Sequence, residues 1–351
     1  MRGKRFVTRA GRPVAAVAVL TIGLVSPALA APVGQPTLRQ LGDGAGISIG
    51  SAVRDYAIQQ DSRYAGLLGA QYGMVTPENE MKWATVHPWP YVYNYGPADD
   101  IVSFAVAHHM QVRGHTLVWY QQNPTWLTNG AFNRSQLIAI LKSHILNVVG
   151  HYRGKVSQWD VVNEAFDDHG HLRHDVWLDG IGPDYIAMAF RWAHQADPGA
   201  KLYYNDFGFE EGGAKADAIY SMVAGLRAQG VPIDGVGFQM HISDPDDFNS
   251  ARLAGEMARF NRLGLAVAVT EMDVWLRPPG AGPMLDEEAG IFRGALADCR
   301  SAADCHTFVT WGFTDRYSWV SETSPPDGWA LPFDSNYAPK PAVGAIEAAL
   351  R

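Results

Sequence analysis

The sequence predicts an α/β protein with a single (β/α)8, or TIM, barrel. Eight short apolar segments recur along the chain, segments with helical periodicity separate them, and together they extend over roughly 300 residues. Near-continuous apolar runs are typical of strands that are buried on both faces of a parallel sheet. The eight predicted strands are residues 47–53, 72–79, 111–119, 156–165, 201–207, 235–241, 266–274 and 306–315.

Four of the intervening segments carry helix signals. Residues 98–110 and 134–152 repeat apolar side chains every three or four positions, as one buried helix face requires. Residues 182–198 begin with a Pro-Asp pair and stop at a proline, and residues 250–264 end at a glycine, a natural C-terminal cap. A doubly wound open sheet is the rival fold, but the even strand count and the lack of a Gly-rich phosphate loop favour the barrel.

The first 30 residues predict a secretory signal peptide. A basic head precedes an apolar run at 14–25, and Ala28 and Ala30 are the small residues that close it. We therefore expect cleavage after Ala30 and a secreted mature protein of residues 31–351. A membrane anchor is the alternative, and it is disfavoured because the apolar run is too short to span a bilayer. The basic residues of the head are Arg2, Lys4, Arg5, Arg9 and Arg12.

Composition excludes some classes of partner. Apolar residues make up 47% and charged residues 18% of the chain, which is typical of a folded soluble protein. Removal of the five basic residues of the head lowers the net charge from −8 to about −13. An acidic surface disfavours nucleic acid and anionic membranes as partners, so we expect neither. A monomer is the default expectation.

The chain has two cysteines, Cys299 and Cys305. Export to an oxidising space would favour a disulfide that closes a short loop, and a pair of free thiols is the alternative. Two cysteines alone make a poor zinc site, and the adjacent His108 and His109 are weak evidence for a metal. We expect no metal and no cofactor.

Polar and aromatic residues follow the predicted strands where these end. In a (β/α)8 barrel, the strand ends and the loops after them form one rim, where active sites lie. These side chains are therefore expected to converge. They are Glu78, Asn79 and Lys82; His115, Trp119 and Gln122; Asn163 and Glu164; Asn205 and Asp206; Gln239 and His241; Glu271 and Asp273; and Trp311 and Trp319.

This combination suits the cleavage of a glycosidic bond. Amides, imidazoles and a lysine can hold several hydroxyl groups, and indoles match the C–H face of a sugar ring. Of two carboxyl groups, such as Glu164 and Glu271, one can protonate the leaving oxygen while the other attacks or activates water. A single glutamate at a strand end is more often a helix cap or a rim ion pair. Two of them among Trp and His side chains favour catalysis.

Seven sequence blocks occur in this order: "MVTPENEMKW", "RGHTLVW", "WDVVNEAF", "LYYNDF", "GVGFQMH", "VTEMDV" and "TWGFTDRYSWV", followed by a closing segment, "LPFDSNYAPKPA". Together they resemble glycoside hydrolase family 10, the retaining endo-xylanases, along almost the whole chain from about Leu38. The resemblance implies a secreted, bacterial-type endo-1,4-β-xylanase that cleaves xylan by double displacement without a cofactor. It implies a catalytic barrel over residues 31–351 and a disulfide between the two cysteines.

The resemblance also implies individual roles. Glu164 would be the acid/base, Glu271 the nucleophile, and His241 and Asp273 would keep the nucleophile ionised and oriented. Asn163 would hydrogen-bond the 2-hydroxyl of the sugar that is cleaved. The remaining substrate-binding residues would be Glu78, Asn79, Lys82, His115, Trp119, Gln122, Gln239, Trp311 and Trp319.

The chain departs from the family pattern in two places. Tyr120 stands where members commonly have His, which puts the surroundings of the acid/base in doubt. Phe207 and Gly208 stand where members often have Tyr-Asn, so we expect weaker binding of the departing chain. A cellulase or β-1,3-xylanase on the same barrel is one alternative. A non-catalytic carbohydrate-binding barrel is another, but it would be expected to lose a carboxylate.

Overall fold

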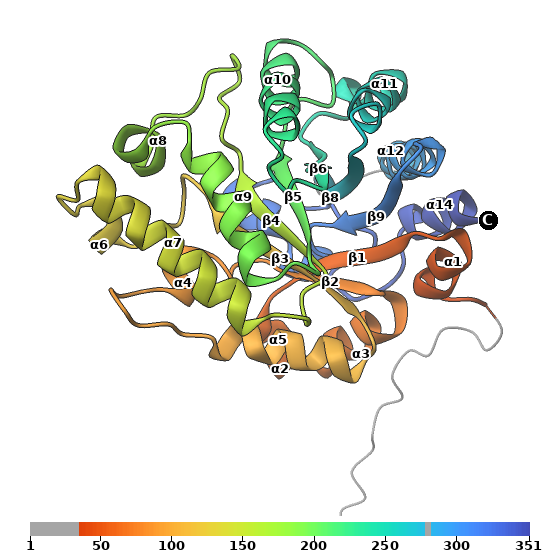
Figure 1. Cartoon of the computed structure of the whole chain (residues 1–351). Helices are drawn as coiled ribbons and strands as arrows, with labels where there is room; N and C mark the ends of the chain where they lie inside the picture. The colour runs from red at the N-terminus through yellow and green to blue at the C-terminus, as the bar shows by residue number, and fades with distance from the viewer. Residues whose placement is uncertain (1–34, 278–281) are drawn as a thin grey trace, which may run out of the picture. The chain divides into compact units, whose positions relative to one another are not determined.

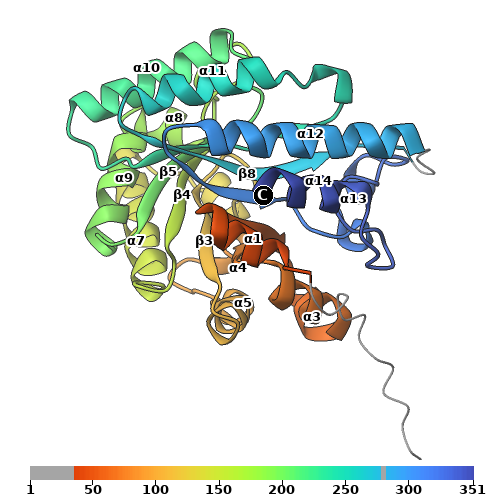
Figure 2. The same ribbon diagram turned by 90° about the vertical axis from the view of Figure 1, so that its right-hand side faces the viewer.

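The computed structural model describes residues 35–277 and 282–351, which form a closed (β/α)8 barrel (Figure 1; Figure 2 shows it turned by 90°). The strand order is β6-β5-β4-β3-β2-β1-β9-β8, a pairing between β6 and β8 closes the ring, and every pairing is parallel. The predicted fold class is confirmed, and the open-sheet alternative is wrong. The predicted signal peptide lies outside the described residues. The barrel strands are β1 (Ser48–Val53), β2 (Met74–Pro77), β3 (Gln111–Val118), β4 (Gln158–Asn163), β5 (Lys201–Asp206), β6 (Gly235–Phe238), β8 (Ala266–Val274) and β9 (Cys305–Thr310).

The predicted strand at 235–241 is interrupted. It ends as β6 at Phe238, and a two-residue strand, β7 (His241–Ile242), follows and pairs with β8. Met240 has a φ of 63°, a left-handed conformation that a strand cannot contain. The break lets the chain turn at the rim, so that Gln239 and His241 both reach the cavity described below.

Helices alternate with the strands and surround the barrel in Figure 1. The four predicted helices are present as α5, α7, α9 and α11, with ends shifted by up to three residues. In the described part of the chain, no helix is long and apolar enough to cross a membrane. The helices are α1 (Leu38–Ala45), α2 (Asp55–Gln60), α3 (Ser62–Gln71), α4 (Trp83–Val86), α5 (Gly96–Ala107), α6 (Thr125–Thr128), α7 (Arg134–His151), α8 (Val176–Ile181), α9 (Tyr185–Ala196), α10 (Ala214–Ala228), α11 (Ser250–Asn261), α12 (Gly282–Ser301), α13 (Trp319–Thr323) and α14 (Pro341–Leu350), with short 3-10 turns η1 (Pro245–Asp247) and η2 (Asp315–Tyr317).

A charged pair occupies the barrel interior. Arg113 on β3 and Asp160 on β4 are fully buried and hydrogen-bonded to each other, and the Arg113 guanidinium lies 4.6 Å from the centre of the Tyr203 ring. Burial alone would raise the pKa of Asp160, but Arg113 and His115 together outweigh it and lower that pKa. Gly114, between Arg113 and His115, is required for space, since a Cβ there would lie 2.2 Å from the Trp159 ring.

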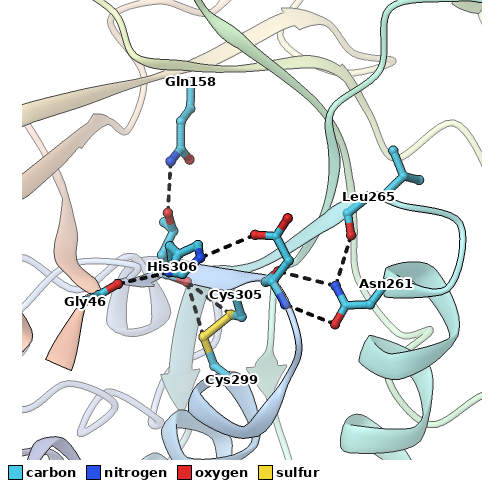
Figure 3. Close-up of a disulfide and its surroundings, with 9 residues drawn as sticks. Gly46, Gln158, Asn261, Leu265, Cys299, Cys305 and His306 are labelled. Atoms are coloured by element: carbon cyan, nitrogen blue, oxygen red, sulfur yellow. Dashed lines mark hydrogen bonds and ion pairs between the residues drawn. A yellow bond between two sulfur atoms is a disulfide. The ribbon is translucent and has the colours of Figure 1, made fainter.

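Cys299 near the end of α12 and Cys305 at the start of β9 form the expected disulfide (Figure 3). Both sulfur atoms are buried, and the adjacent His306 ring contacts the main-chain oxygen of Gly46 at 3.0 Å. Because Cys305 is the first residue of β9, the bond lies at the end of the barrel opposite the rim where the strands finish. Its role is therefore structural.

We predict that Cys299→Ala/Cys305→Ala lowers the free energy of unfolding by about 2 kcal/mol, because a loop of this length is no longer closed in the unfolded chain. Urea unfolding with and without a reductant measures this. The reductant should destabilise the parent by a similar amount and leave the double variant unchanged. Equal stability of the two proteins in the absence of reductant would contradict the prediction.

Candidate active site

The loops at the carboxyl ends of the strands enclose a cavity of about 760 Å³. Every residue predicted for catalysis or substrate binding lines it except Asp273, which is fully buried behind His241. Asn205 and Asp206, which were also expected at this rim, are fully buried and do not line the cavity. The predicted convergence is otherwise present in the structure. The lining residues among those predicted are Glu78, Asn79, Lys82, His115, Trp119, Gln122, Asn163, Glu164, Gln239, His241, Glu271, Trp311 and Trp319.

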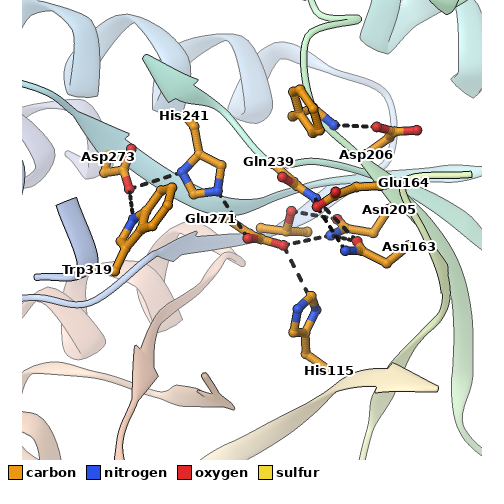
Figure 4. Close-up of polar contacts among 12 residues, drawn as sticks. His115, Asn163, Glu164, Asn205, Asp206, Gln239, His241, Glu271, Asp273 and Trp319 are labelled. Carbon is orange, nitrogen blue, oxygen red and sulfur yellow. Dashed lines mark hydrogen bonds and ion pairs between the residues drawn. The ribbon is translucent and has the colours of Figure 1, made fainter. Parts of the chain in front are cut away.

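Glu271, on β8, is surrounded by donors (Figure 4). Asn205 Nδ2 donates to its Oε1 at 2.7 Å, and His241 Nε2 lies 3.1 Å from its Oε2. His115 Nδ1 lies 3.9 Å from Oε1. Burial would raise the pKa of Glu271, but the two imidazoles outweigh it and lower that pKa. The structure therefore holds Glu271 as an anion.

His241 owes its charge to the residue behind it. Its Nδ1 lies 3.0 Å from Asp273 Oδ2, and the indoles of Trp319 and Trp275 donate to Asp273 at 2.8 and 2.9 Å. Burial on its own lowers the pKa of His241, but Asp273 and then Glu271 raise it to about 10. Both ring nitrogens therefore carry protons at neutral pH, and one of them points at Glu271.

Glu164, directly after β4, is held in a different way. Its Oε1 accepts from Asn163 Nδ2 at 3.0 Å and from Gln239 Nε2 at 2.9 Å, so both donors are neutral amides. Within the described part of the chain, its other oxygen has no hydrogen-bond partner. Its backbone is in the left-handed region, with φ of 55°, and its amide donates to the Asn205 main-chain oxygen at 2.9 Å. This sharp turn directs the side chain into the cavity.

Asn205, at the end of β5, connects the two glutamates. Its Nδ2 lies 2.7 Å from Glu271 and 2.8 Å from Asn163 Oδ1, and Asn163 in turn donates to Glu164. Thr270 donates to Asn205 Oδ1 at 2.7 Å, which fixes the orientation of the amide. Sequence reasoning noted Asn205 at a strand end but gave it no role, because its partners come from neighbouring strands.

His115 is supported from inside the barrel. Its Nδ1 lies 3.1 Å from Asp160 Oδ2, and Asp160 is paired with Arg113. Neither Asp160 nor Arg113 was predicted as a site residue. The signal was present, since both are charged residues within otherwise apolar strand segments. Such residues are costly to bury unless paired, so they indicate a functional or structural ion pair.

A second cluster of polar side chains lines the cavity near the ends of β1 and β2. Arg54, after β1, donates to Glu78 at 2.8 Å and pairs with Glu322 of α13 at 2.6 Å. Lys82 donates to Asn79 at 3.3 Å and lies 4.8 Å from the Trp119 ring centre. Burial lowers the pKa of Lys82, against the opposing effect of Glu271. Sequence reasoning missed Arg54 and Glu322, since each follows its strand without a recognisable motif.

Aromatic rings cover the remaining cavity wall. Trp311 lies edge-on to His115, with ring centres 5.1 Å apart. Trp319 lies edge-on to His241 at 5.1 Å and to Trp275 at 5.5 Å. Trp275, which was not assigned to core or rim from the sequence, also lines the cavity.

Two of the residues that depart from the family pattern, Tyr120 and Phe207, lie near Arg173, and the ring centre of Phe207 also lies 3.8 Å from Lys215 Nζ. Arg173 lies 4.7 Å from the ring centre of Tyr120 and 5.9 Å from that of Phe207, and its Nε donates to the Glu164 main-chain oxygen at 3.1 Å. Tyr120 therefore acts through its ring, by packing on the arginine that supports the Glu164 backbone. Gly208 has a φ of 66° and nothing within 4 Å of an added Cβ.

The two carboxyl groups can divide the chemistry between them. Glu271 is an anion beside imidazoles, which suits a nucleophile. Glu164 is held by neutral amides, which tolerate either protonation state and so suit a group that gives and takes a proton. In residues 35–277 and 282–351, no cluster of His, Cys, Asp or Glu is arranged to hold a metal ion.

A barrel with this pair at its rim, lined by indoles, defines a glycoside hydrolase. Residues 37–349 match the model of glycosyl hydrolase family 10. The chain belongs to this family.

The relatives that the chain is similar to are named as xylanases. The chain is 42% identical to endo-1,4-beta-xylanase B of Thermotoga neapolitana, over 88% of this chain and 90% of the relative. It is 39% identical to endo-1,4-beta-xylanase 1 of Humicola insolens, over 93% and 77%. The crystal structure of xylanase 10B from Thermotoga petrophila RKU-1 in complex with xylobiose superimposes with a TM-score of 0.88 at 40% identity, covering 91% of this chain and 98% of that one.

We predict that His241→Asn raises the pKa of Glu271, because it removes a cationic donor. The carboxylate then protonates at a higher pH, so the acid limb of the kcat/KM profile moves to higher pH, and kcat/KM at neutral pH falls by about a hundredfold. A pH–rate series on a soluble substrate measures both. His306→Asn, at an exposed histidine far from the cavity, is the control. An acid limb that stays in place would show that His241 does not control this ionisation.

Proposed function

We propose that the protein is a secreted endo-1,4-β-xylanase that hydrolyses internal xylosidic bonds with retention of configuration. The observation that carries the proposal is the pairing of an ionised Glu271 with an amide-held Glu164 in one cavity. Relatives named as xylanases support the substrate, as does the xylobiose in the complex from T. petrophila.

The reaction takes place in two displacements. Glu271 attacks the anomeric carbon while Glu164 gives its proton to the departing oxygen, so a carbon–oxygen bond to the enzyme forms as the glycosidic bond breaks. Glu164 then removes a proton from water, which attacks the same carbon and releases Glu271. Two inversions give net retention. Asn163 lies beside Glu164 and is connected to Glu271 through Asn205, and there it can also hold the 2-hydroxyl of the sugar.

The length of the groove favours internal cleavage. A second hollow of about 550 Å³ adjoins the cavity and shares Phe207, His241 and Ser243 with it. The cavity itself extends the other way to Tyr56 and Glu322. A polymer can therefore pass through on both sides of the glutamates.

Secretion is proposed on separate grounds, and a monomeric state is the default proposal. The signal-peptide pattern of residues 1–30 supports export, with residues 31–351 as the mature catalytic protein. The bonded Cys299 and Cys305 suit an oxidising compartment. Sequencing the amino terminus of protein recovered from the culture medium would test both the export and the cleavage after Ala30.

We expect the parent to release short xylo-oligosaccharides from β-1,4-xylan and little from cellulose, while Glu164→Ala and Glu271→Ala release almost none. With an activated aryl xyloside as substrate, added azide distinguishes the roles of the two glutamates. Azide attacks without the help of a base, so it should restore turnover of Glu164→Ala and give the β-xylosyl azide. In Glu271→Ala, azide should take the place of the missing carboxylate and give the α-xylosyl azide. Glucose oligomers would instead indicate a cellulase with the same mechanism. Exchanged azide products would reverse the two assignments.

Gly208→Asn should raise kcat/KM on long oligosaccharides by about tenfold, because it restores an amide on the proposed leaving-group side. The site has room, and Asn tolerates the left-handed backbone better than most residues. Gly208→Ala carries the same backbone strain without the amide and is the matched control. No gain of the Asn variant over the Ala variant, on xylohexaose relative to xylotriose, would count against the prediction.

A further inference from the structure

A hollow of about 590 Å³ lies on the flank of the barrel, between the turn at residues 88–92 and the outer face of α7. In Figure 1, α4, α6 and α7 gather on this flank. We propose that the hollow is a second carbohydrate-binding site, which holds a neutral pyranose polymer next to the catalytic cleft. The choice of xylan as that polymer rests on the proposed function.

Aromatic rings form the wall of the hollow. The rings of His87 and Tyr93 are stacked, with centres 4.2 Å apart, and Trp126 lies 5.1 Å from His87 and 6.3 Å from Phe132. All four line the hollow together with Tyr91. A packed set of flat rings at a surface presents the shape that the C–H face of a sugar ring matches.

The adjacent turn leaves large apolar side chains in water. Of the five large hydrophobic side chains exposed among the described residues, three lie at Trp89, Tyr91 and Val92, and Tyr91 is 97% exposed. Tyr91 has a φ of 64°, which is uncommon outside glycine. Exposed apolar groups that cluster beside a hollow mark a binding surface, whereas scattered ones need no explanation.

The hollow carries no ionised side chain. His87 is its only titratable lining residue besides two tyrosines, and burial lowers the pKa of His87 to about 4. The polar groups that remain are neutral and come from one face of α7, at Gln136, Ser143 and Asn147. A peptide, nucleic acid or anionic lipid would lack a charge partner here. Rings flanked by neutral hydroxyl and amide groups suit an uncharged sugar chain.

The hollow is separate from the cleft but close to it. The two share no lining residue. Trp83 stands between them, directly after Lys82 of the cleft, with its ring centre 5.3 Å from that of His87 and 6.4 Å from that of Trp126. Polymer held in the hollow would leave the glutamates accessible and raise the local substrate concentration at the cleft.

The test compares short and polymeric substrates. Trp89→Ala/Tyr91→Ala, and separately Ala139→Glu at an exposed position of α7 in the hollow, should keep kcat/KM on xylotetraose within twofold of the parent. Both should lose about fivefold or more of the apparent affinity for insoluble xylan. Val106→Ala, at an exposed apolar residue of α5, is the control and should change neither. Unchanged affinity for insoluble xylan in both variants would overturn the proposal.

An NMR measurement of ligand binding distinguishes this proposed site from the proposed activity. In Glu271→Gln, which cannot hydrolyse the ligand, xylohexaose should shift the indole N–H resonances of Trp126 in the hollow and Trp319 in the cleft. Ala139→Glu should abolish only the Trp126 shift. A shift of Trp319 alone refutes the second site and leaves the xylanase proposal standing. A shift of Trp126 in a parent that does not cleave xylan refutes the xylanase proposal alone.

Analytical sedimentation of the parent tests whether a second copy of the chain, rather than a carbohydrate, occupies the hollow. A parent dimer that Trp89→Ala/Tyr91→Ala converts to a monomer would show that this face binds a second copy of the chain, and the carbohydrate site would be refuted.

Discussion

The site depends on a buried ion pair that never meets the substrate. Arg113 and Asp160 neutralise each other inside the barrel, where an isolated charge would be very costly. Because Asp160 is thereby kept ionised, it can hold His115, and His115 stands 3.9 Å from Glu271. The support of the proposed nucleophile therefore begins one layer below the rim, at the buried pair inside the barrel.

Two chemically identical side chains receive different hydrogen-bond donors from their neighbours. Glu271 has imidazoles, one of them charged through Asp273, whereas Glu164 has the amides of Asn163 and Gln239. Asn205 and Asn163 connect the two groups through hydrogen bonds that carry no net charge. The division of labour is thus set by the type of donor each carboxyl group receives, since both are buried to a similar degree.

Much of this arrangement could be predicted from the sequence, because parallel strands that close a barrel must end at one rim. Polar residues at strand ends, such as Glu164 and Glu271, were therefore expected to converge. The contributions of Asn205 and Arg173 could not be predicted, since each depends on which residue faces it across a strand or loop. The interruption at Met240 was also missed, because a left-handed residue inside an apolar run leaves no mark on the hydrophobic pattern.

The ion pair of Arg54 with Glu322 has a mechanical consequence. Arg54 follows β1 and Glu322 lies in α13, the helix after β9, so the pair bridges the place where the first and last strands of the barrel meet. The same Arg54 also holds Glu78 in the cavity wall. This junction and the wall therefore share one side chain. A local opening of the barrel between these two strands would therefore also displace Glu78 in the wall of the substrate groove.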